Sequence, residues 1–355
     1  MADAQQRIIE VRKELEQVDD ALVEALEARA RLSRRIREEG AGGGVDVGER
    51  QWLEALLAKG TGALPEPSLR RILLQVRAES RALEQPVRVG HLGTELGFCH
   101  QAARSYFGAG SEFVGVDEVR GLFEEVERGR AAYVVFPFES SVDGLNQPNI
   151  AALAETDLVI VAQSELPTRY DLVSSGNPVE QVRTVYASDQ SLTACGLILG
   201  RELTRATVVD VRSPAAAVRR AREEPTSAAI VPAPTALESG LQVVRPNVGD
   251  AGDVKVRFAI AGPRPASRTG RDATCLLFSV NDEPGALYSV LRHFAEREVN
   301  LKRMQARPVA GEGFDYVFFV ELDGHVTDRS LVTATEAVKR STRYFRILGS
   351  FPALS

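Results

Sequence analysis

Apolar residues recur at helical spacing along the first part of the chain. Ile8, Leu15, Leu22 and Ile36 are separated by multiples of seven residues, and no glycine or proline interrupts residues 3–39. This pattern predicts one long helix. Such a helix is roughly 50 Å long, more than a small domain can cover, so a second copy of the chain is predicted to bury part of its apolar stripe.

Two shorter helical segments complete a first, all-helical domain over residues 1–86. The glycine run 40–44 lacks the lysine and hydroxyl of a phosphate-binding loop, so it is predicted to be a flexible connection. A short helix is predicted over 49–59, and a third helix reaches Leu83 with Ser68 as its candidate N-cap.

From Pro86 onward the pattern changes to short β-rich runs separated by helical or loop segments. The runs are VRVGHL, AAYVVFPF, DLVIVAQ, RTVYAS, TVVDV and AAIVP. This alternation predicts an α/β domain over residues 87–264. Residues 262–272 are rich in glycine, proline and arginine, which is typical of a linker. The remaining segment, 272–355, predicts an α+β module of strand, helix, two strands, helix and strand (βαββαβ).

Composition and charge exclude several classes of protein. The chain has 355 residues, 44% of them hydrophobic and 26% charged, which suits two or three globular domains. A net charge of -6 argues against nucleic acid as a partner. No apolar stretch is long enough for a membrane span and no signal core opens the chain, so a cytoplasmic location is expected. Three separated cysteines and four scattered histidines give no disulfide framework or metal constellation, and we expect neither a metal nor a cofactor.

Polar residues interrupt the apolar stripes of the first domain. Arg12 and Arg29 lie on the row of the first helix, and Ser80 and Glu84 continue that of the third. A pocket lined by these groups would suit a small dicarboxylate, because a guanidinium binds a carboxylate through two parallel hydrogen bonds. The alternative is that the arginines lie at the stripe edge and extend to water.

The three helices resemble the all-helical chorismate mutase domain, an intertwined dimer in which one arginine of the first helix reaches into the partner's site. The resemblance implies that Arg12, Arg29, Arg50, Ser80 and Glu84 act in the rearrangement of chorismate to prephenate. That family has a lysine about eleven residues after the arginine that Arg29 matches. Here the corresponding position is Gly40, the first residue of the run 40–44. Arg35 or Arg37 could supply the missing charge.

The α/β segment resembles the two-lobed prephenate dehydratase. The runs GHLGTELGFCHQAARSYF, VVFPFESSVDGLN, VYASDQSLTAC and VKVRF correspond to four of its motifs, and the resemblance implies catalytic roles for Glu139 and Arg257. Several hydroxyl or amide positions of these motifs are changed, namely to Gly97, Cys99, Ser140, Ala187, Ala194 and Val256. Replacing a hydroxyl by valine removes a proton donor, so dehydratase activity is expected to be absent or very low.

The last module resembles a ligand-binding ACT domain. NDEPGALYSVL and VNLKRMQARP correspond to its two phenylalanine-binding motifs, where Gln305 and Ala306 replace a glutamate and a serine. The resemblance implies that phenylalanine is bound by Gly285, Ala286, Leu287, Asn300, Leu301 and Arg307.

The order of the three domains is that of the bifunctional chorismate mutase-prephenate dehydratase family of phenylalanine synthesis. The resemblance implies an enzyme that is a homodimer or higher oligomer, uses chorismate and prephenate as substrates and has L-phenylalanine as effector. The alternative is a catalytically impaired protein that binds an aromatic metabolite or regulates another enzyme. An enzyme with an altered substrate in the middle domain is a third possibility.

Overall fold

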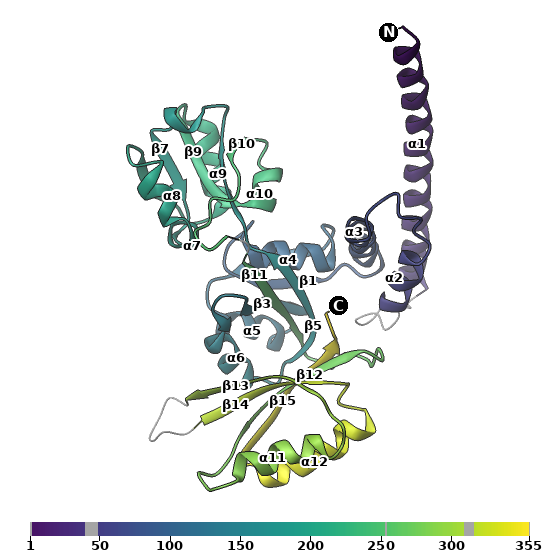
Figure 1. Cartoon of the computed structure of the whole chain (residues 1–355), viewed down its shortest axis with the longest axis vertical. Helices are drawn as coiled ribbons and strands as arrows, with labels where there is room; N and C mark the ends of the chain where they lie inside the picture. The colour runs from purple at the N-terminus through teal and green to yellow at the C-terminus, as the bar shows by residue number, and fades with distance from the viewer. Residues whose placement is uncertain (1, 40–48, 253, 309–315, 355) are drawn as a thin grey trace. The chain divides into compact units, whose positions relative to one another are not determined.

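The structure is a computed structural model that describes residues 2–39, 49–252, 254–308 and 316–354 (Figure 1). The chain divides into two compact units. The first comprises Met1–Gly44, Gln51–Val87 and Arg104–Glu112, and the second comprises the remainder. The predicted glycine connection 40–44 lies outside the described residues. In the structure, the helical unit extends to Val87, and Arg104–Glu112 are grouped with it as well.

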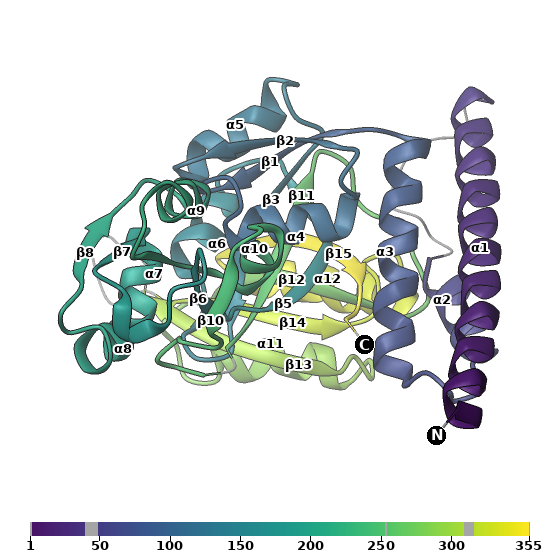
Figure 2. The same cartoon turned by 90° about the horizontal axis from the view of Figure 1, so that it is seen from above.

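The helical unit contains the three predicted helices. They are α1 (Ala2–Glu38), α2 (Glu49–Leu57) and α3 (Glu66–Glu84). Helices α1 and α3 lie side by side (Figure 2). The prediction of Ser68 as N-cap was wrong, because α3 begins at Glu66 with Pro65 in the capping position. Pro67 fits the first turn, where its missing N–H is not needed, so the helix extends past it.

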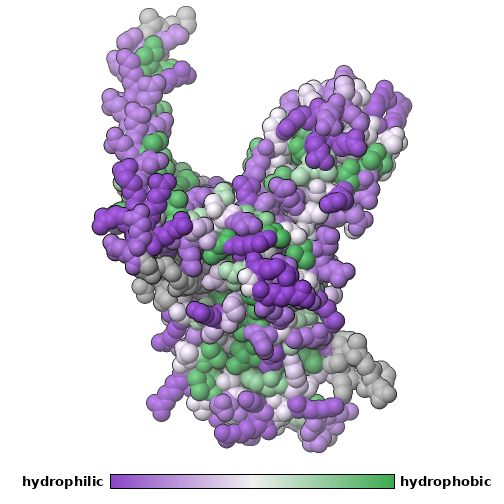
Figure 3. Space-filling view, turned by 180° about the vertical axis from the view of Figure 1, so that it is seen from behind, coloured by the Kyte–Doolittle hydropathy of each residue, from purple (hydrophilic) through white to green (hydrophobic). Residues whose placement is uncertain are grey.

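Most of the apolar stripe of α1 is exposed. Ile8, Leu15 and Leu22 are 55%, 56% and 57% exposed, and Val11 and Val18 are equally open. In the space-filling view, hydrophobic side chains follow α1 along the column that the helix forms (Figure 3). Monomeric proteins rarely expose an apolar surface of this extent.

The second unit begins with a lobe built on a mixed sheet with the strand order β2-β1-β3-β11-β5, and β4 pairs with β3. The strands are β1 (Arg88–Leu92), β2 (Glu112–Val116), β3 (Tyr133–Ser140), β4 (Gly144–Leu145), β5 (Val159–Pro167) and β11 (Lys255–Gly262). The helices along this stretch are α4 (Phe98–Phe107), α5 (Val119–Glu127) and α6 (Gln147–Ala154). Strand β1 is parallel to β3, whereas β11 is antiparallel to both β3 and β5.

A second lobe is inserted between β5 and β11. Its sheet has the order β10-β6-β9-β7-β8. The strands are β6 (Tyr170–Ser174), β7 (Thr184–Ala187), β8 (Thr207–Asp210), β9 (Ser227–Pro232) and β10 (Gln242–Arg245). The helices are the 3-10 turn η1 (Val179–Gln181), α7 (Asp189–Ala194), α8 (Gly196–Arg201), α9 (Pro214–Glu223) and α10 (Ala233–Glu238).

The sequence pattern missed some strands of both lobes. Strands β2 and β10 lie at sheet edges, and neither has a fully buried side chain. An edge strand that buries little has a weak hydrophobic signal, so alternation alone does not reveal it.

The C-terminal module has the predicted βαββαβ order and the sheet order β13-β14-β12-β15. Its elements are β12 (Asp272–Ser279), α11 (Ala286–Ala295), β13 (Leu301–Pro308), β14 (Tyr316–Asp323), α12 (Arg329–Ser341) and β15 (Tyr344–Pro352). One face of the sheet packs against α11 and α12, which lie together on that side in Figure 1. The other face joins the core of the first lobe, where the Phe138 and Phe319 rings meet at 5.7 Å. The sheet is therefore buried on both faces.

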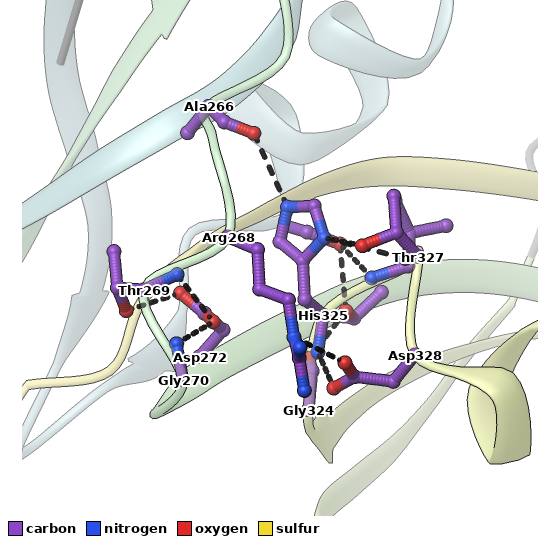
Figure 4. Close-up of polar contacts among 12 residues, drawn as sticks. Ala266, Arg268, Thr269, Gly270, Asp272, Gly324, His325, Thr327 and Asp328 are labelled. Carbon is purple, nitrogen blue, oxygen red and sulfur yellow. Dashed lines mark hydrogen bonds and ion pairs between the residues drawn. The ribbon is translucent and has the colours of Figure 1, made fainter. Parts of the chain in front are cut away.

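The predicted linker connects β11 to β12, and side-chain hydrogen bonds hold it against the C-terminal module. His325 lies between the connector and the turn that precedes α12 (Figure 4). Its Nδ1 accepts from the Thr327 N–H at 3.2 Å, so the ring proton is on Nε2, which donates to the Ala266 carbonyl at 3.1 Å. Asp272 accepts hydrogen bonds from Thr269 and Gly270 at the end of the connector. Side-chain bonds thus fix a segment that its composition marks only as a linker.

Candidate functional site

A polar cluster lies between α1 and α3. Ser33 of α1 donates from Oγ to Glu84 Oε1 at 3.0 Å, and Arg77 of α3 donates from Nη1 to the same oxygen at 3.1 Å. The Ser80 hydroxyl, one turn before Glu84, donates to the Val76 carbonyl at 2.8 Å. Residues three and four apart share a helix face, which explains why 77, 80 and 84 project together.

Arg29 joins this cluster from α1. Its Nη1 donates to the Val76 carbonyl at 3.3 Å, and its guanidinium lies 5.6 Å from the centre of the Trp52 ring of α2. Burial lowers the pKa of Arg29, the positive charge of Arg77 lowers it further, and the carboxylate of Glu84 opposes the change. The guanidinium still stays charged, because arginine deprotonates only far above physiological pH.

The structure brings together three of the five residues predicted for the mutase site, namely Arg29, Ser80 and Glu84. Arg12 lies 17 residues before Arg29 on α1, roughly 25 Å along the axis, and its side chain is exposed. Within one chain Arg12 is therefore outside the cluster. Arg50 belongs to α2, but its side chain lies outside the described residues.

Sequence reasoning missed Arg77 as a member of the cluster. Its position was visible, because Leu73, Arg77, Ser80 and Glu84 follow one another at spacings of four, three and four. Arg35 and Arg37, considered as sources of the missing charge, are both exposed, and Arg35 is paired with Glu39 at 3.9 Å. Neither belongs to the cluster.

Glu139 and Arg257 of the dehydratase-like lobe are brought together, but in a network with the C-terminal module. They are register partners on β3 and β11, and Arg257 Nη1 lies 3.0 Å from Glu139 Oε2. The same guanidinium binds both carboxylate oxygens of Glu321 on β14, at 3.1 and 3.2 Å. Arg303 of β13 pairs with the other oxygen of Glu139, and Arg257 Nη2 also donates to Gln163 of β5.

Most of this network is buried and its charges are balanced, with Arg303 as its more exposed member. The side chains of Glu139, Arg257 and Glu321 are 14%, 14% and 7% exposed. Two guanidiniums face two carboxylates, so each charge has a partner that offsets the cost of leaving water. The contacts of Glu139 and Arg257 support a structural role between lobe and module, while their catalytic assignment remains a prediction.

The changed motif positions of the lobes lie on several elements. Val256 and Ser140 are register partners on β11 and β3. The Ser140 hydroxyl accepts from the N–H groups of Val142 and Asp143 at 3.2 and 3.3 Å, so it caps the turn after β3. Ala187 ends β7 and is fully buried, and Ala194 ends α7.

The glycine loop before α4 contains Leu96 with a φ of 61°. The Leu96 N–H donates to His100 Nδ1 at 2.9 Å, and its carbonyl accepts from Thr235 of the second lobe at 2.8 Å. His91 stacks on His100, and burial lowers the pKa of His91 to about 4. Burial also raises the pKa of the Cys99 thiol to about 12, so this cysteine is not a ready nucleophile.

The predicted phenylalanine-binding residues are divided between two ends of the C-terminal module. Strands β12 and β13 both run antiparallel to β14, so their carboxyl ends lie on the same side. Gly285, with a φ of 84°, follows β12 and precedes Ala286 and Leu287 of α11, and Arg307 is near the end of β13.

Asn300 and Leu301 lie at the opposite end of β13. Asn300 Nδ2 donates to Asp323 at 2.7 Å, and Lys302 pairs with the same carboxylate at 2.6 Å. Burial alone would raise the pKa of Asp323, but the bonds from Asn300 and Lys302 outweigh it and lower the pKa. Within one chain, Asn300 and the Gly285 loop therefore do not form a single site.

Metal-binding clusters and membrane spans are both absent from the described residues. No group of three or more histidine, cysteine, aspartate or glutamate side chains in this part of the chain is placed to hold a metal ion. None of the described helices combines the length and apolarity that crossing a membrane requires.

Comparison with known proteins decides the family. Residues 89–266 match the family model of prephenate dehydratase. The bifunctional chorismate mutase/prephenate dehydratase of Aquifex aeolicus is 32% identical over 351 residues, which cover 97% of each chain. The chain belongs to the bifunctional chorismate mutase/prephenate dehydratase family. By family it is an enzyme.

Solved structures resemble about three quarters of this bifunctional family member. The prephenate dehydratase of Arthrobacter aurescens in complex with L-Phe is 29% identical, with a TM-score of 0.63, over 75% of this chain and 90% of that chain. A protein described as a novel type of quorum quenching acylase is 26% identical, with a TM-score of 0.62, over 75% of this chain and 98% of its own.

Proposed function

We propose that the helical unit catalyses the rearrangement of chorismate to prephenate. The observation that carries this proposal is the partly buried cluster of Arg29, Ser80 and Glu84 between α1 and α3. Chorismate carries two carboxylates, and its rearrangement involves no covalent bond to the protein. A guanidinium would hold one carboxylate in a fixed pose, and neighbouring donors would stabilise the charge that grows on the breaking ether oxygen.

The deciding experiment incubates the pure protein with chorismate and follows both prephenate and phenylpyruvate. We expect prephenate to accumulate. If neither product forms above the uncatalysed rate, the second candidate is favoured, a catalytically impaired protein that binds an aromatic metabolite or another enzyme. The replaced dehydratase motifs at Ser140 and Val256 are what support that candidate.

The exposed stripe of α1 supports a homodimer or higher oligomer, in which Arg12 of a second copy would complete the mutase site. The double variant Leu15→Glu/Leu22→Glu is expected to reduce the association state in sedimentation and to lower mutase activity together, because charge on the stripe opposes its burial. The matched control Lys13→Glu, on the opposite side of the helix, should keep both. A wild-type chain that sediments as a monomer would contradict the proposal.

The dehydratase step, prephenate to phenylpyruvate, is proposed to be absent or very slow in this chain. Expulsion of hydroxide from prephenate needs a proton donor, and Val256 offers none at a position where the family has threonine. A lost transition-state donor typically costs about 10²–10³ in rate. Phenylpyruvate release from prephenate should therefore be far below an ordinary turnover, while the same preparation converts chorismate.

The companion variant for this prediction is Val256→Thr/Ser140→Asn, because these positions are register partners and the restored groups would be neighbours. It is expected to release phenylpyruvate at least as fast as the native protein, although one pair of groups need not restore a whole constellation. Native turnover on the order of 1 s⁻¹ or more would show that other residues supply the donor.

The C-terminal module is proposed to be an ACT domain that binds L-phenylalanine through the Gly285 loop. Binding is expected to be weaker than the family norm, for which the L-Phe-bound Arthrobacter protein serves as reference, because Gln305 replaces the glutamate of the family motif and a charge-assisted hydrogen bond is roughly twice as strong as a neutral one. Calorimetry of both proteins side by side measures this difference.

Two glycine variants test the location of that ligand. Gly285→Leu should abolish the binding heat, whereas Gly270→Leu, in another turn with positive φ and open space, should keep it. Tight binding that survives Gly285→Leu would reject both the weakness and the site.

The remaining proposals concern partners and location. We propose that the protein binds small molecules only, with no nucleic acid or membrane partner and no cofactor. We also propose a cytoplasmic location.

A further inference from the structure

Arg77 is a buried guanidinium in the middle of the candidate mutase cluster. Its side chain is 11% exposed and that of its partner Glu84 is 17% exposed. It lies one turn before Ser80 on the same face of α3. It is also close enough to Arg29 for its charge to lower the pKa of that group. Two guanidiniums from different helices thus converge on one place.

The position of Arg77 is held by contacts that leave little freedom. Glu84 Oε1 accepts from Arg77 Nη1 at 3.1 Å and from the Ser33 hydroxyl at 3.0 Å, so one carboxylate oxygen ties α1 to α3 beside the guanidinium. A donor oriented in this way before substrate arrives loses little entropy when it acts.

Among the side chains that the structure describes, the other candidate cations on α1 do not reach the cluster. Arg35 and Arg37 are exposed, Arg12 is about 25 Å away along α1, and the sequence has no lysine between Lys13 and Lys59. If Arg29 and the Arg12 of a second copy each hold one carboxylate of chorismate, the ether oxygen still needs a cationic donor. In the described residues, Arg77 is a buried cation of this cluster, whereas Arg29 is half-buried.

We infer that Arg77 is a catalytic residue of the mutase site and donates to the ether oxygen of chorismate as the carbon–oxygen bond breaks. Glu84 is then a positioning residue that orients the Arg77 guanidinium. The inference rests on the proposed mutase function. A guanidinium is a planar donor that is always charged, so it suits an oxygen whose negative charge appears only in the transition state.

The test uses the full chain and measures kcat and KM for chorismate together with thermal unfolding. Arg77→Gln is expected to lower kcat by about 10²-fold or more with a smaller change in KM, because one transition-state donor is lost. Arg77→Lys keeps a charge and should retain part of kcat. The control Arg71→Gln, exposed on the same helix, should behave as the wild type.

A comparison of double and single variants separates catalysis from structure. Arg77→Gln leaves Glu84 without its guanidinium, so the loss could reflect a buried carboxylate. The double variant Arg77→Gln/Glu84→Gln removes that carboxylate and is compared with Glu84→Gln alone. We expect kcat of the double variant to stay about 10²-fold or more below that of Glu84→Gln.

Two results would overturn the inference. One is equal kcat for the double variant and Glu84→Gln, and the other is a loss in Arg77→Gln that appears only in KM. If Arg77→Gln does not fold, Arg77→Lys decides, and wild-type kcat in that variant with the same pH profile would reject a guanidinium at the ether oxygen. A wild-type protein that does not convert chorismate would instead refute the proposed function on which the inference rests.

Discussion

Arg29→Ala is expected to lower kcat/KM for chorismate by well over tenfold. Arg29 is half-buried, donates to the Val76 carbonyl and lies over the Trp52 ring. Arg29 is proposed to hold a carboxylate of chorismate, and truncating one partner of a buried, hydrogen-bonded charge pair typically costs about 2–5 kcal/mol, which is roughly 30-fold to several thousandfold. The effect should appear in binding of chorismate, since this guanidinium is proposed to hold a substrate carboxylate in ground and transition states alike.

The control for this variant is Arg31→Ala, an exposed arginine two residues along α1. Trp52 is the one tryptophan of the sequence, so its fluorescence reports whether the pocket around Arg29 stays folded. An unchanged rate in Arg29→Ala with native fluorescence would remove Arg29 from the site.

Arg257→Ala is expected to lower the free energy of unfolding by about 3–5 kcal/mol, because it leaves the buried carboxylates of Glu139 and Glu321 without their shared guanidinium. Urea-induced unfolding of the full chain measures the loss. The expected effect is on stability, and it does not depend on whether the lobe catalyses any reaction.

Lys255→Ala is the matched control, since Lys255 lies two residues away on the same strand and pairs with Glu165 at 3.0 Å. Both side chains of that pair are well exposed, and such surface pairs contribute about 0–1 kcal/mol. Equal destabilisation by the two variants would show that the network around Arg257 is no more than a surface ion pair.

The network also changes how the motif glutamate is understood. A glutamate at position 139 suggested dehydratase chemistry by resemblance, but in the fold its two oxygens bind Arg257 and Arg303. Arg303 belongs to β13, so the network joins a strand of the C-terminal module to the first lobe. The structure shows Glu139 in a contact between lobe and module, and its catalytic role stays a prediction.

The sequence by itself determined the elements whose side chains alternate between burial and exposure with a regular period. The spacing of seven residues between Ile8, Leu15 and Leu22 predicted α1. The hydrophobic pattern of the last module likewise predicted its βαββαβ order. Motif residues also gave the family before any fold was known. These properties are local, since a helix or strand repeats every 3.6 or 2 residues along the chain.

Only the tertiary structure decided which of the motif residues meet. Arg257 bonds to residues 118 and 64 positions away, Glu139 and Glu321, because β3 and β14 belong to two sheets that share a core. It also separated Arg12 from Arg29 on one straight helix, and Asn300 from Gly285 at opposite ends of a module. Arg77 entered the candidate site because α1 packs against α3 on the row of Glu84. Which distant side chains come into contact depends on how the buried faces of helices and sheets pack. The local periodicity of the chain carries no information about which faces pack together.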